Sequence, residues 1–425
     1  MKKTLRLLLS LLVAVGPSIA LHAQGSDPTL EKIRQARYVA PSPNVESLGL
    51  LHYSDLHGDD VSVKMLLDAM SKYGPYIDAV VATGDMVHYY ADPTSDYKNA
   101  ADWWKKTGLP EKSLFVLGNH DGAVRSEARG HLEGSADWDY KGKYWDFDTY
   151  FSDYVGMLGY NMPEGFRNPS SPYYKSCFWY KDFEAAKVRI IGLDCIHYND
   201  SFHYLTSEQE EWLKATLAET LVPGGPVNDY SVIILCHYPI DDYNGDNEVW
   251  DESSHRFKFN VRSQGGRVMD MRTGGVVNFH SYPRTSLKLD KRFSIRNKVP
   301  LESAKYGYEK GAANPLADIV QAWVNDGGKF VAWLSGHCHA DLMFYSEYYP
   351  DLLCVAVDQA GNLRGNSLSD RPEGGESRAC ANFYSVDTQN GLFKIVRIGG
   401  LTRDRFMVEK DVLCYDYINR VVIFE

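Results

Sequence analysis

Five short fragments of this sequence carry side chains that bind metal ions, and each follows a run of apolar residues. Imidazoles, carboxylates and one amide oxygen are all present among them. This set of donors is too large for one metal ion and about right for two. The fragments are Asp55-Leu56-His57, Gly84-Asp85, Gly118-Asn119-His120-Asp121, His237 and Gly336-His337-Cys338-His339.

Oxygen and imidazole donors together suit Mn, Fe, Zn, Ni or Co. A carboxylate such as Asp85 has two oxygens and can bridge two cations. Two metal ions roughly 3.5–4 Å apart can hold a water between them and lower its pKa, which produces a metal-bridging hydroxide. The same ions neutralise charge on phosphate oxygens during in-line displacement. The fragments therefore predict a dinuclear centre of divalent or trivalent transition-metal ions.

Each fragment alone is weak evidence. Gly-Asp is common by chance, and Asp-x-His is usually part of a loop. The combination is more specific because every fragment follows a predicted strand. These strands are predicted at 48–54, 77–82, 113–117, 232–236 and 329–334.

Predicted helices lie between the strands that carry the five fragments. Helices are predicted after Asp60, from the capping box at 206–209 and from Asn314-Pro315 onward, so the strands and helices alternate. Such alternation indicates βαβ units with parallel pairing. Ligands of open α/β sheets bind outside the carboxyl ends of the strands. We therefore expect the fragments to converge at one edge of a sheet.

The order of the five fragments resembles the calcineurin-like metallophosphoesterase superfamily, over about residues 47 to 340. The resemblance implies an α/β fold, a four-layer α/β/β/α sandwich with two mixed β-sheets. It implies one metal ion held by Asp55, His57 and His339, and a second held by Asn119, His237 and His337, with Asp85 bridging them.

The resemblance also implies catalytic roles for His120 and Asp121. His120 would face the substrate beside Asn119, so that both contact it, and would stabilise the phosphoryl oxygens or protonate the leaving group. Asp121 would orient His120. Purple acid phosphatases would have a Tyr three residues after Asp85, where this chain has His88, so the sequence does not predict a tyrosinate–iron site.

Several other polar residues near the predicted strand ends favour structural roles. His52 lies within a strand and is interpreted as a hydrogen-bonded core histidine. Cys236 and Cys338 adjoin proposed ligands, and we expect them to be buried behind the site. Asp194 and His197 follow a strand at 188–193 and are also interpreted as structural.

Three functions remain open for this set of residues. A metal-dependent phosphoesterase would cleave phosphomonoesters or phosphodiesters of a small phosphorylated substrate. A pyrophosphatase-like hydrolase would act on nucleotides or nucleotide sugars. A catalytically silent binding protein would keep the fold for recognition, but it has no physical need for all of these ligands.

The 425-residue chain carries a formal net charge of -11, which disfavours a nucleic acid or an anionic membrane surface as a partner. Residues 1–23 have the plan of a secretory signal peptide, with a basic start, an apolar run and small residues before Gln24. A buried N-terminal helix is the alternative. No later segment approaches the ~20 apolar residues of a transmembrane helix. We expect an exported protein, periplasmic or secreted.

Residues 24–425 are predicted to form one metallophosphoesterase domain with an insertion at about 241–312. The first part of the insertion is acidic and the second part, Arg262 to Lys298, is basic. The basic part is interpreted either as a phosphate clamp over the site or as a solvated surface hairpin. Most of the seven scattered cysteines are expected to be buried thiols that pack like small apolar side chains.

Overall fold

The computed structural model describes about half of the chain, including all the strands that the sequence predicted to carry the site. The sequence also predicts helices near 96–106 and 147–158. These two segments, the predicted signal peptide, and the residues His88, Asp194 and His197 lie outside the described residues. The described residues are 27–38, 46–57, 60–86, 113–116, 118, 178–193, 207–240, 248–251, 256–259, 267–269, 276–277, 280–283, 315–337, 342–345, 349, 351–357, 360, 379–399 and 413–423.

One mixed sheet has seven strands in the order β18-β17-β16-β15-β1-β2-β3. Strands β1, β2 and β3 run parallel, and the remaining neighbours pair antiparallel. All residues of β1 are buried, as expected for a strand covered on both faces. The strands are β1 (Leu48–Tyr53), β2 (Ala79–Ala82), β3 (Ser113–Phe115), β15 (Cys380–Asp387), β16 (Leu392–Gly399), β17 (Leu413–Asp416) and β18 (Val421–Ile423).

The second mixed sheet has eight strands in the order β10-β9-β13-β14-β12-β6-β5-β4. Its centre is parallel, from β5 through β6 and β12 to β14. The strands are β4 (Trp179–Phe183), β5 (Val188–Gly192), β6 (Ser231–Leu235), β9 (Arg267–Met269), β10 (Val276–Val277), β12 (Lys329–Ser335), β13 (Leu342–Tyr345) and β14 (Leu353–Ala356).

Part of the segment predicted as an insertion joins the larger sheet. Strand β9 pairs antiparallel with β13, and β10 pairs with β9. A separate three-stranded antiparallel sheet has the order β11-β8-β7. Its strands are β7 (Glu248–Asp251), β8 (Arg256–Phe259) and β11 (His280–Pro283). The boundaries of the insertion and of the domain stay predictions.

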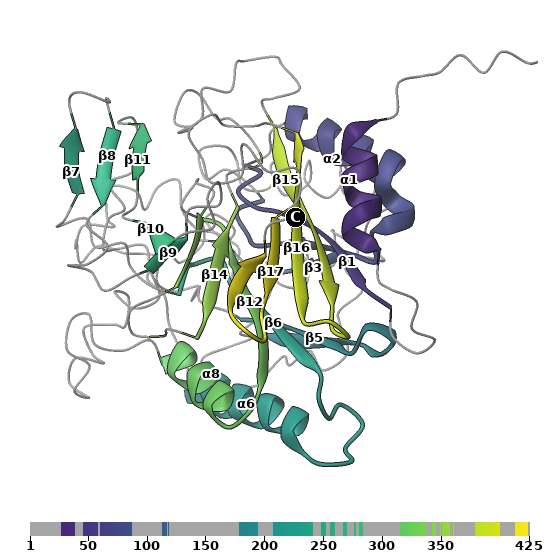
Figure 1. Ribbon diagram of the computed structural model, residues 1–425, viewed down its shortest axis with the longest axis vertical. Helices are drawn as coiled ribbons and strands as arrows, with labels where there is room; N and C mark the ends of the chain where they lie inside the picture. The colour runs from purple at the N-terminus through teal and green to yellow at the C-terminus, as the bar shows by residue number, and fades with distance from the viewer. Residues whose placement is uncertain are drawn as a thin grey trace, which may run out of the picture.

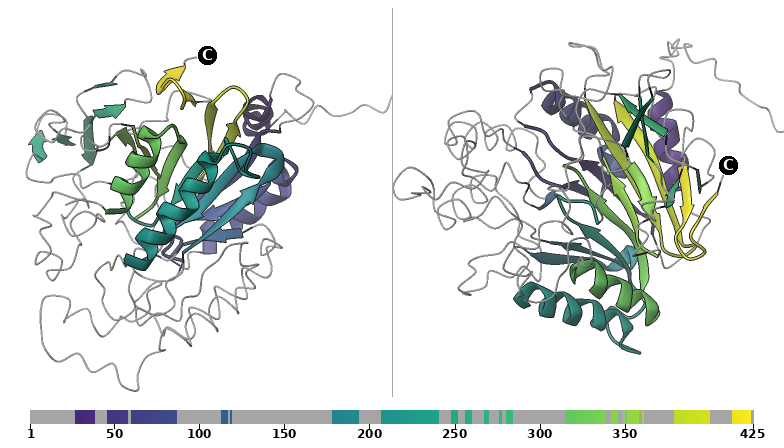
Figure 2. Two further views of the ribbon diagram at one scale, coloured as in Figure 1. Left: turned by 90° about the horizontal axis from the view of Figure 1, so that it is seen from below. Right: turned by 90° about the vertical axis from the view of Figure 1, so that its left-hand side faces the viewer.

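Helices cover the outer faces of the two large sheets (Figures 1 and 2). Helix α1 (Pro28–Arg37) contacts β15 and β16, and α2 (Asp60–Tyr73) contacts β15. Helices α6 (Ser207–Ala218) and α8 (Pro315–Asn325) pack on each other beside the eight-stranded sheet. The short 3-10 helices are η1 (Gly74–Tyr76), η5 (Glu184–Ala186) and η6 (Glu219–Leu221). The α/β/β/α architecture with two mixed sheets is thus confirmed.

None of the described helices combines the length and the apolar composition needed to span a membrane. The hydrophobic side chains of the sheets and helices form the core instead. Its centre includes Leu50, Val81, Ile233 and Trp333, none of them more than 1% exposed.

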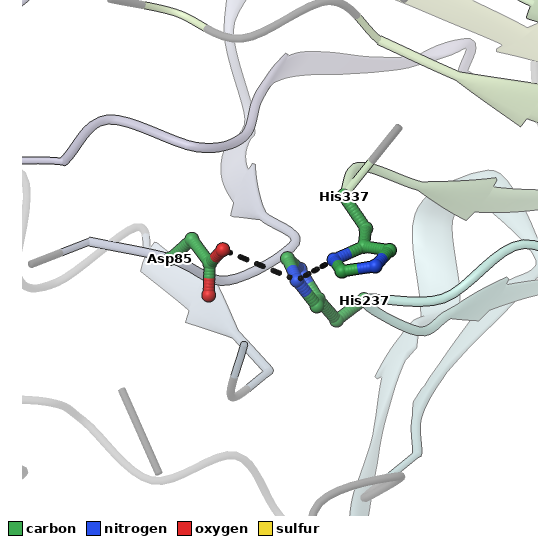
Figure 3. A group of neighbouring side chains, drawn as sticks. All are labelled: Asp85, His237 and His337. Atoms are coloured by element: carbon green, nitrogen blue, oxygen red, sulfur yellow. Dashed lines mark hydrogen bonds and ion pairs between the residues drawn. The ribbon is translucent and has the colours of Figure 1, made fainter. Parts of the chain in front are cut away.

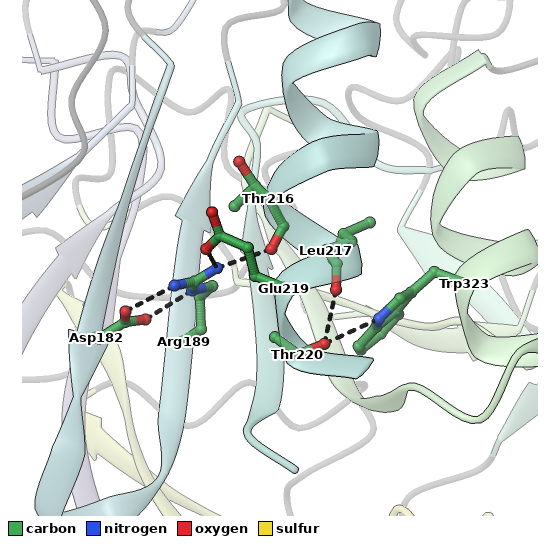
Figure 4. A network of polar contacts seen from close by, with 7 residues as sticks. All are labelled: Asp182, Arg189, Thr216, Leu217, Glu219, Thr220 and Trp323. Carbon is green, nitrogen blue, oxygen red and sulfur yellow. Dashed lines mark hydrogen bonds and ion pairs between the residues drawn. The ribbon is translucent and has the colours of Figure 1, made fainter. Parts of the chain in front are cut away.

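A buried arginine ties β4 and β5 to the helical layer (Figure 4). Arg189 donates to both carboxylate oxygens of Asp182, at 2.7 and 2.8 Å, and to Glu219 and the Thr216 carbonyl, each at 2.7 Å. The guanidinium also lies 4.1 Å from the ring centre of Tyr180. Burial disfavours the charged form, but the two carboxylates outweigh it and raise the pKa of Arg189. Arg189 lies beside Val232 near the start of β6, whereas the predicted metal ligand His237 follows the other end of that strand.

Candidate metal centre

Five predicted ligands lie just beyond the carboxyl ends of four strands. Asp55 and His57 follow β1, Asp85 follows β2, His237 follows β6 and His337 follows β12. Strands β1 and β2 belong to the seven-stranded sheet, whereas β6 and β12 belong to the eight-stranded sheet. The strand pattern alone predicted convergence at one edge of a single sheet. The structure corrects that expectation, because the two sheets contribute jointly.

An unusual backbone conformation presents four of these five residues. The φ angles are 52° at Asp55, 51° at His57, 57° at Asp85 and 65° at His337. Residues other than glycine seldom adopt this left-handed region, and each such position costs about 1–3 kcal/mol. Strain of this kind persists where surrounding contacts enforce it and gathers at functional sites.

Hydrogen bonds between the strand ends enforce these conformations. The Asp55 amide donates to the Gly84 carbonyl at 2.9 Å, and the His57 amide donates to the Asp85 carbonyl at 3.0 Å. Across the sheets, the His337 amide donates to Asp55 Oδ2 at 2.8 Å. The loops after β1, β2 and β12 therefore hold one another in place.

Three glycines allow the loops to approach this closely. A Cβ atom at Gly118 would collide with the carboxylate of Asp85, and one at Gly336 would lie 2.5 Å from Asp55 Oδ2. A Cβ at Gly84 would lie 2.8 Å from His237 Nδ1, and Gly84 itself has a φ of 97°. These glycines thus clear the space in which the ligand side chains meet.

The ligand atoms form two groups that share Asp85. One group is Asp85, His237 and His337, and the other is Asp55, His57 and Asp85, each with its ligand atoms within 4.8 Å of one another. His237 Nε2 lies 3.4 Å from Asp85 Oδ2 and 3.0 Å from His337 Nδ1 (Figure 3). In the other group, His57 Nε2 lies 3.8 Å from Asp55 Oδ1.

The protonation of His237 follows from its hydrogen bond to the backbone. Its Nδ1 lies 2.6 Å from the carbonyl oxygen of Thr83, which can only accept. The hydrogen of the neutral imidazole is therefore on Nδ1, and the lone pair is on Nε2. That lone pair faces Asp85 and His337, as a metal ligand requires.

Burial of these groups fits a cation-binding role. Asp55 and Asp85 are 0% and 1% exposed, so two carboxylates lie in a dry environment within reach of imidazole nitrogens. Buried carboxylates require compensating positive charge. The mixture of oxygen and nitrogen donors is one that transition-metal ions prefer. The residues present therefore fit a dinuclear metal centre.

The remaining predicted site residues lie outside the described residues. Gly118, directly before Asn119, lies against Asp85, and His337 ends the described part of its loop. The roles of four site residues therefore stay predictions. They are Asn119, His120, Asp121 and His339.

Two supporting residues were not identified as such from the sequence. Thr83 accepts the hydrogen bond of His237, and nothing in its residue type signals that role. The Tyr238 ring lies 5.1 Å from the His237 ring and 4.4 Å from the His337 ring, between centroids. The sequence Tyr238-Pro239 after His237 predicts only a turn that presents His237. The predicted burial of His52 and Cys236 is confirmed.

Comparison with known proteins agrees with this site. The sequence profile of the calcineurin-like phosphoesterase family matches residues 48–264, just over half of the chain. The chain belongs to this family and is a metal-dependent phosphoesterase. The predicted resemblance is thereby confirmed. No curated protein sequence matches the chain.

Several solved structures are similar to this chain at low identity. A dimetal phosphatase from Danio rerio is 10% identical, with 84% of this chain and 97% of that one covered and a TM-score of 0.44. A purple acid phosphatase from yellow lupin is 12% identical, with coverages of 88% and 55% and a TM-score of 0.39. GAP50, the anchor in the inner membrane complex of Plasmodium, is 11% identical, with coverages of 89% and 90% and a TM-score of 0.40. At these values the likenesses carry no argument about this chain.

Proposed function

We propose that the enzyme hydrolyses phosphomonoesters or phosphodiesters of small molecules at a dinuclear centre. The observation that carries this proposal is the position of Asp85, whose carboxylate belongs to both groups of ligand atoms. A buried carboxylate shared by two donor groups suits a bridge between two cations. The proposed ligands are Asp55, His57, Asp85, Asn119, His237, His337 and His339.

Two bound metal ions would supply Lewis-acid chemistry, which activates a water and neutralises charge on the phosphate oxygens. The chain itself holds the ligand atoms in position and buries them away from solvent. Asp55 joins the two sheets by accepting from the His337 amide, and His237 is held in one tautomer by Thr83. Burial of these side chains strengthens every electrostatic interaction in the centre.

Substrate contacts are proposed for Asn119 and His120. His120 would place its imidazole against the phosphoryl oxygens or the leaving oxygen, and donate a proton there. Asp121 would orient that imidazole. Gly118, which lies against Asp85, supports this proposal because it brings the start of the segment to the metal centre.

A metal-supplemented substrate screen tests the proposal. The purified chain is loaded in turn with Mn²⁺, Zn²⁺ and Fe²⁺ and assayed on para-nitrophenyl phosphate, bis(para-nitrophenyl) phosphate and a nucleotide sugar. We expect cleavage of the monoester or the diester with about two metal ions bound per chain. Cleavage of the nucleotide sugar alone would favour the pyrophosphatase alternative. Metal binding without any cleavage would favour the silent binding protein.

Export to the periplasm or the medium is also proposed, because the first 23 residues follow the plan of a signal peptide. Mass spectrometry of the mature protein would then find Gln24 at its N-terminus. An intact N-terminus in the mature protein would favour the buried-helix alternative.

A further inference from the structure

A chain of buried hydrogen bonds runs from the core of the seven-stranded sheet to His237. His52, in β1, is fully buried, with Nδ1 2.9 Å from the Tyr384 hydroxyl and Nε2 2.9 Å from Thr83 Oγ1. The carbonyl of the same Thr83 accepts from His237 Nδ1 at 2.6 Å. One residue thus joins His52 to His237.

The strand geometry explains why His52 reaches this position. A Cβ at Gly49 would collide with the Tyr76 carbonyl, so Gly49 faces η1 and the helical layer. Side chains of a strand alternate between its faces, so Leu50 and His52 face the other way, toward the eight-stranded sheet. His52 therefore lies in the layer between the sheets, below the metal centre.

Both ring nitrogens of His52 are hydrogen-bonded, so its imidazole is held in one orientation. The Tyr384 hydroxyl, which also accepts from Asn382 Nδ2 at 3.1 Å, bonds to Nδ1, and Thr83 Oγ1 bonds to Nε2. A hydroxyl can donate or accept, so either tautomer of His52 keeps both bonds. The bond at Nε2 therefore holds the Thr83 side chain in one rotamer.

We propose that His52, acting through Thr83, fixes the tautomer and the orientation of His237. His52 is a positioning residue, since it touches no reacting group. The effect on metal binding rests on the proposed role of His237 as a metal ligand.

Thr83 is where the chain leaves β2, and it needs this support. Its amide donates to the Tyr53 carbonyl at 3.2 Å, and the next residue, Gly84, has a φ of 97°. The Thr83 amide, its Oγ1 and the neighbouring Gly84 carbonyl, which accepts from Asp55, together determine the direction of the Thr83 carbonyl. Loss of the Oγ1 contact removes one of these anchors, and the hydrogen bond with His237 loosens. A histidine that only filled the core would affect stability without affecting His237.

A matched pair of substitutions in the full chain separates these cases. The amide of His52→Gln reaches the position of Nε2 and keeps the contact with Thr83. The amide of His52→Asn reaches only the position of Nδ1 and keeps the contact with Tyr384. Calorimetric titration with Mn²⁺ should show affinity at one of the two sites falling about 10- to 100-fold in His52→Asn, as for other supports of metal-bound histidines. His52→Gln should retain most of the parent's affinity. Equal affinity in His52→Asn and the parent would overturn the proposal, and so would an equal loss in both variants.

A second measurement needs no metal. Long-range ¹H–¹⁵N correlation spectra of the metal-free protein report the tautomer of each histidine. We expect His237 to be protonated at Nδ1 in the parent and in Thr83→Ser, and to become a mixture of tautomers in Thr83→Val and His52→Asn. An unchanged His237 tautomer in both of the latter would refute the proposal. If the parent bound no Mn²⁺, Zn²⁺ or Fe²⁺, the proposed function would be wrong. The spectra of the metal-free protein would still test the role of His52.

Discussion

At the scale of single residues, the metal centre depends on side chains held in costly conformations. Asp55, His57, Asp85 and His337 all have left-handed backbones. Contacts between residues distant in sequence maintain them, such as the hydrogen bond from the His337 amide to Asp55. The centre is therefore preorganised by its surroundings, and changes of a few atoms should have large effects.

Asp85→Asn should nearly abolish hydrolysis. The amide keeps the size of the carboxylate but loses its charge and one anionic oxygen, so it cannot bridge two cations well. We expect metal content below two ions per chain and a loss of at least about 100-fold in kcat/KM. Elemental analysis and steady-state kinetics measure both. Asp68→Asn, the same change on the exposed face of α2, is the control and should behave as the parent. Parent-like metal content and turnover in Asp85→Asn would contradict a bridging role.

Gly336→Ala should weaken metal binding without changing any ligand. Its Cβ would lie 2.5 Å from Asp55 Oδ2 and closer still to Ser54 Oγ, so Asp55 must shift. Overpacking of this kind costs about 1–3 kcal/mol of stability. Calorimetry should show weaker Mn²⁺ affinity than in Gly74→Ala, where the nearest atom is Met70 Cε at 3.9 Å. Equal affinities in the two variants would show that the close approach is unimportant.

His120→Ala tests a role predicted from the sequence alone. A residue that donates a proton but binds no metal contributes about 10²- to 10⁴-fold to the rate. We expect kcat to fall within that range while elemental analysis still finds the parent's metal content. Loss of metal in this variant would instead identify His120 as a ligand.

At the scale of the elements, the strands fall into two groups with different tasks. Strands β1, β2, β6 and β12 end at the metal centre, whereas β4 and β5 meet the helical layer through Arg189. The arginine network is a structural device that lies apart from the chemistry.

Arg189→Met should destabilise the fold and spare the metal centre. Removal of the guanidinium leaves Asp182 and the Thr216 carbonyl without their donor. Breaking a buried ion pair in this way costs about 3 kcal/mol. Urea unfolding measures the loss. Lys329→Met is the control, because its ion pair with Asp229 is solvent-exposed and is worth about 0–1 kcal/mol. Comparable losses in the two variants would contradict the importance of burial.

At the scale of the whole molecule, the metal centre is a joint between two sheets. Asp55 and Asp85 follow strands of one sheet, and His237 and His337 follow strands of the other. Metal ions at this joint would bind the folded chain and not the unfolded chain, so occupancy should stabilise the entire fold.

Metal loading should therefore raise Tm. At a free metal concentration of 100 times Kd, each site contributes about 2.7 kcal/mol, or about 5 kcal/mol for two. With the usual unfolding entropy per residue, this corresponds to a rise in Tm of about 6 °C. Calorimetric scans before and after removal of metal by a chelator measure the rise. It should be smaller in Asp85→Asn. An unchanged Tm with two ions bound would show that metal ions between the two sheets do not stabilise the fold.

Much of the fold was predictable because its signals are local. The runs of β1, β5, β6 and β12 are largely apolar and almost entirely buried, and the predicted strand ends agree with the structure to within a residue or two. Helix α1, with Asp27 as its N-cap, was not predicted, nor were β4, β13 and β17. Strand β4 interrupts its apolar pattern with Lys181 and Asp182, and the latter is explained only by its partner Arg189.

The sequence by itself determined which donors stand at the strand ends, because residue type and position after an apolar run are local properties. Tertiary structure decided that the donors come from two sheets and that Asp85 is shared by two groups of ligands. It also decided the left-handed backbones and the support of His237 by Thr83. These features depend on contacts such as that between Asp55 and His337, which lie 282 residues apart. No local pattern encodes such a contact, because it exists only once the two sheets have packed together.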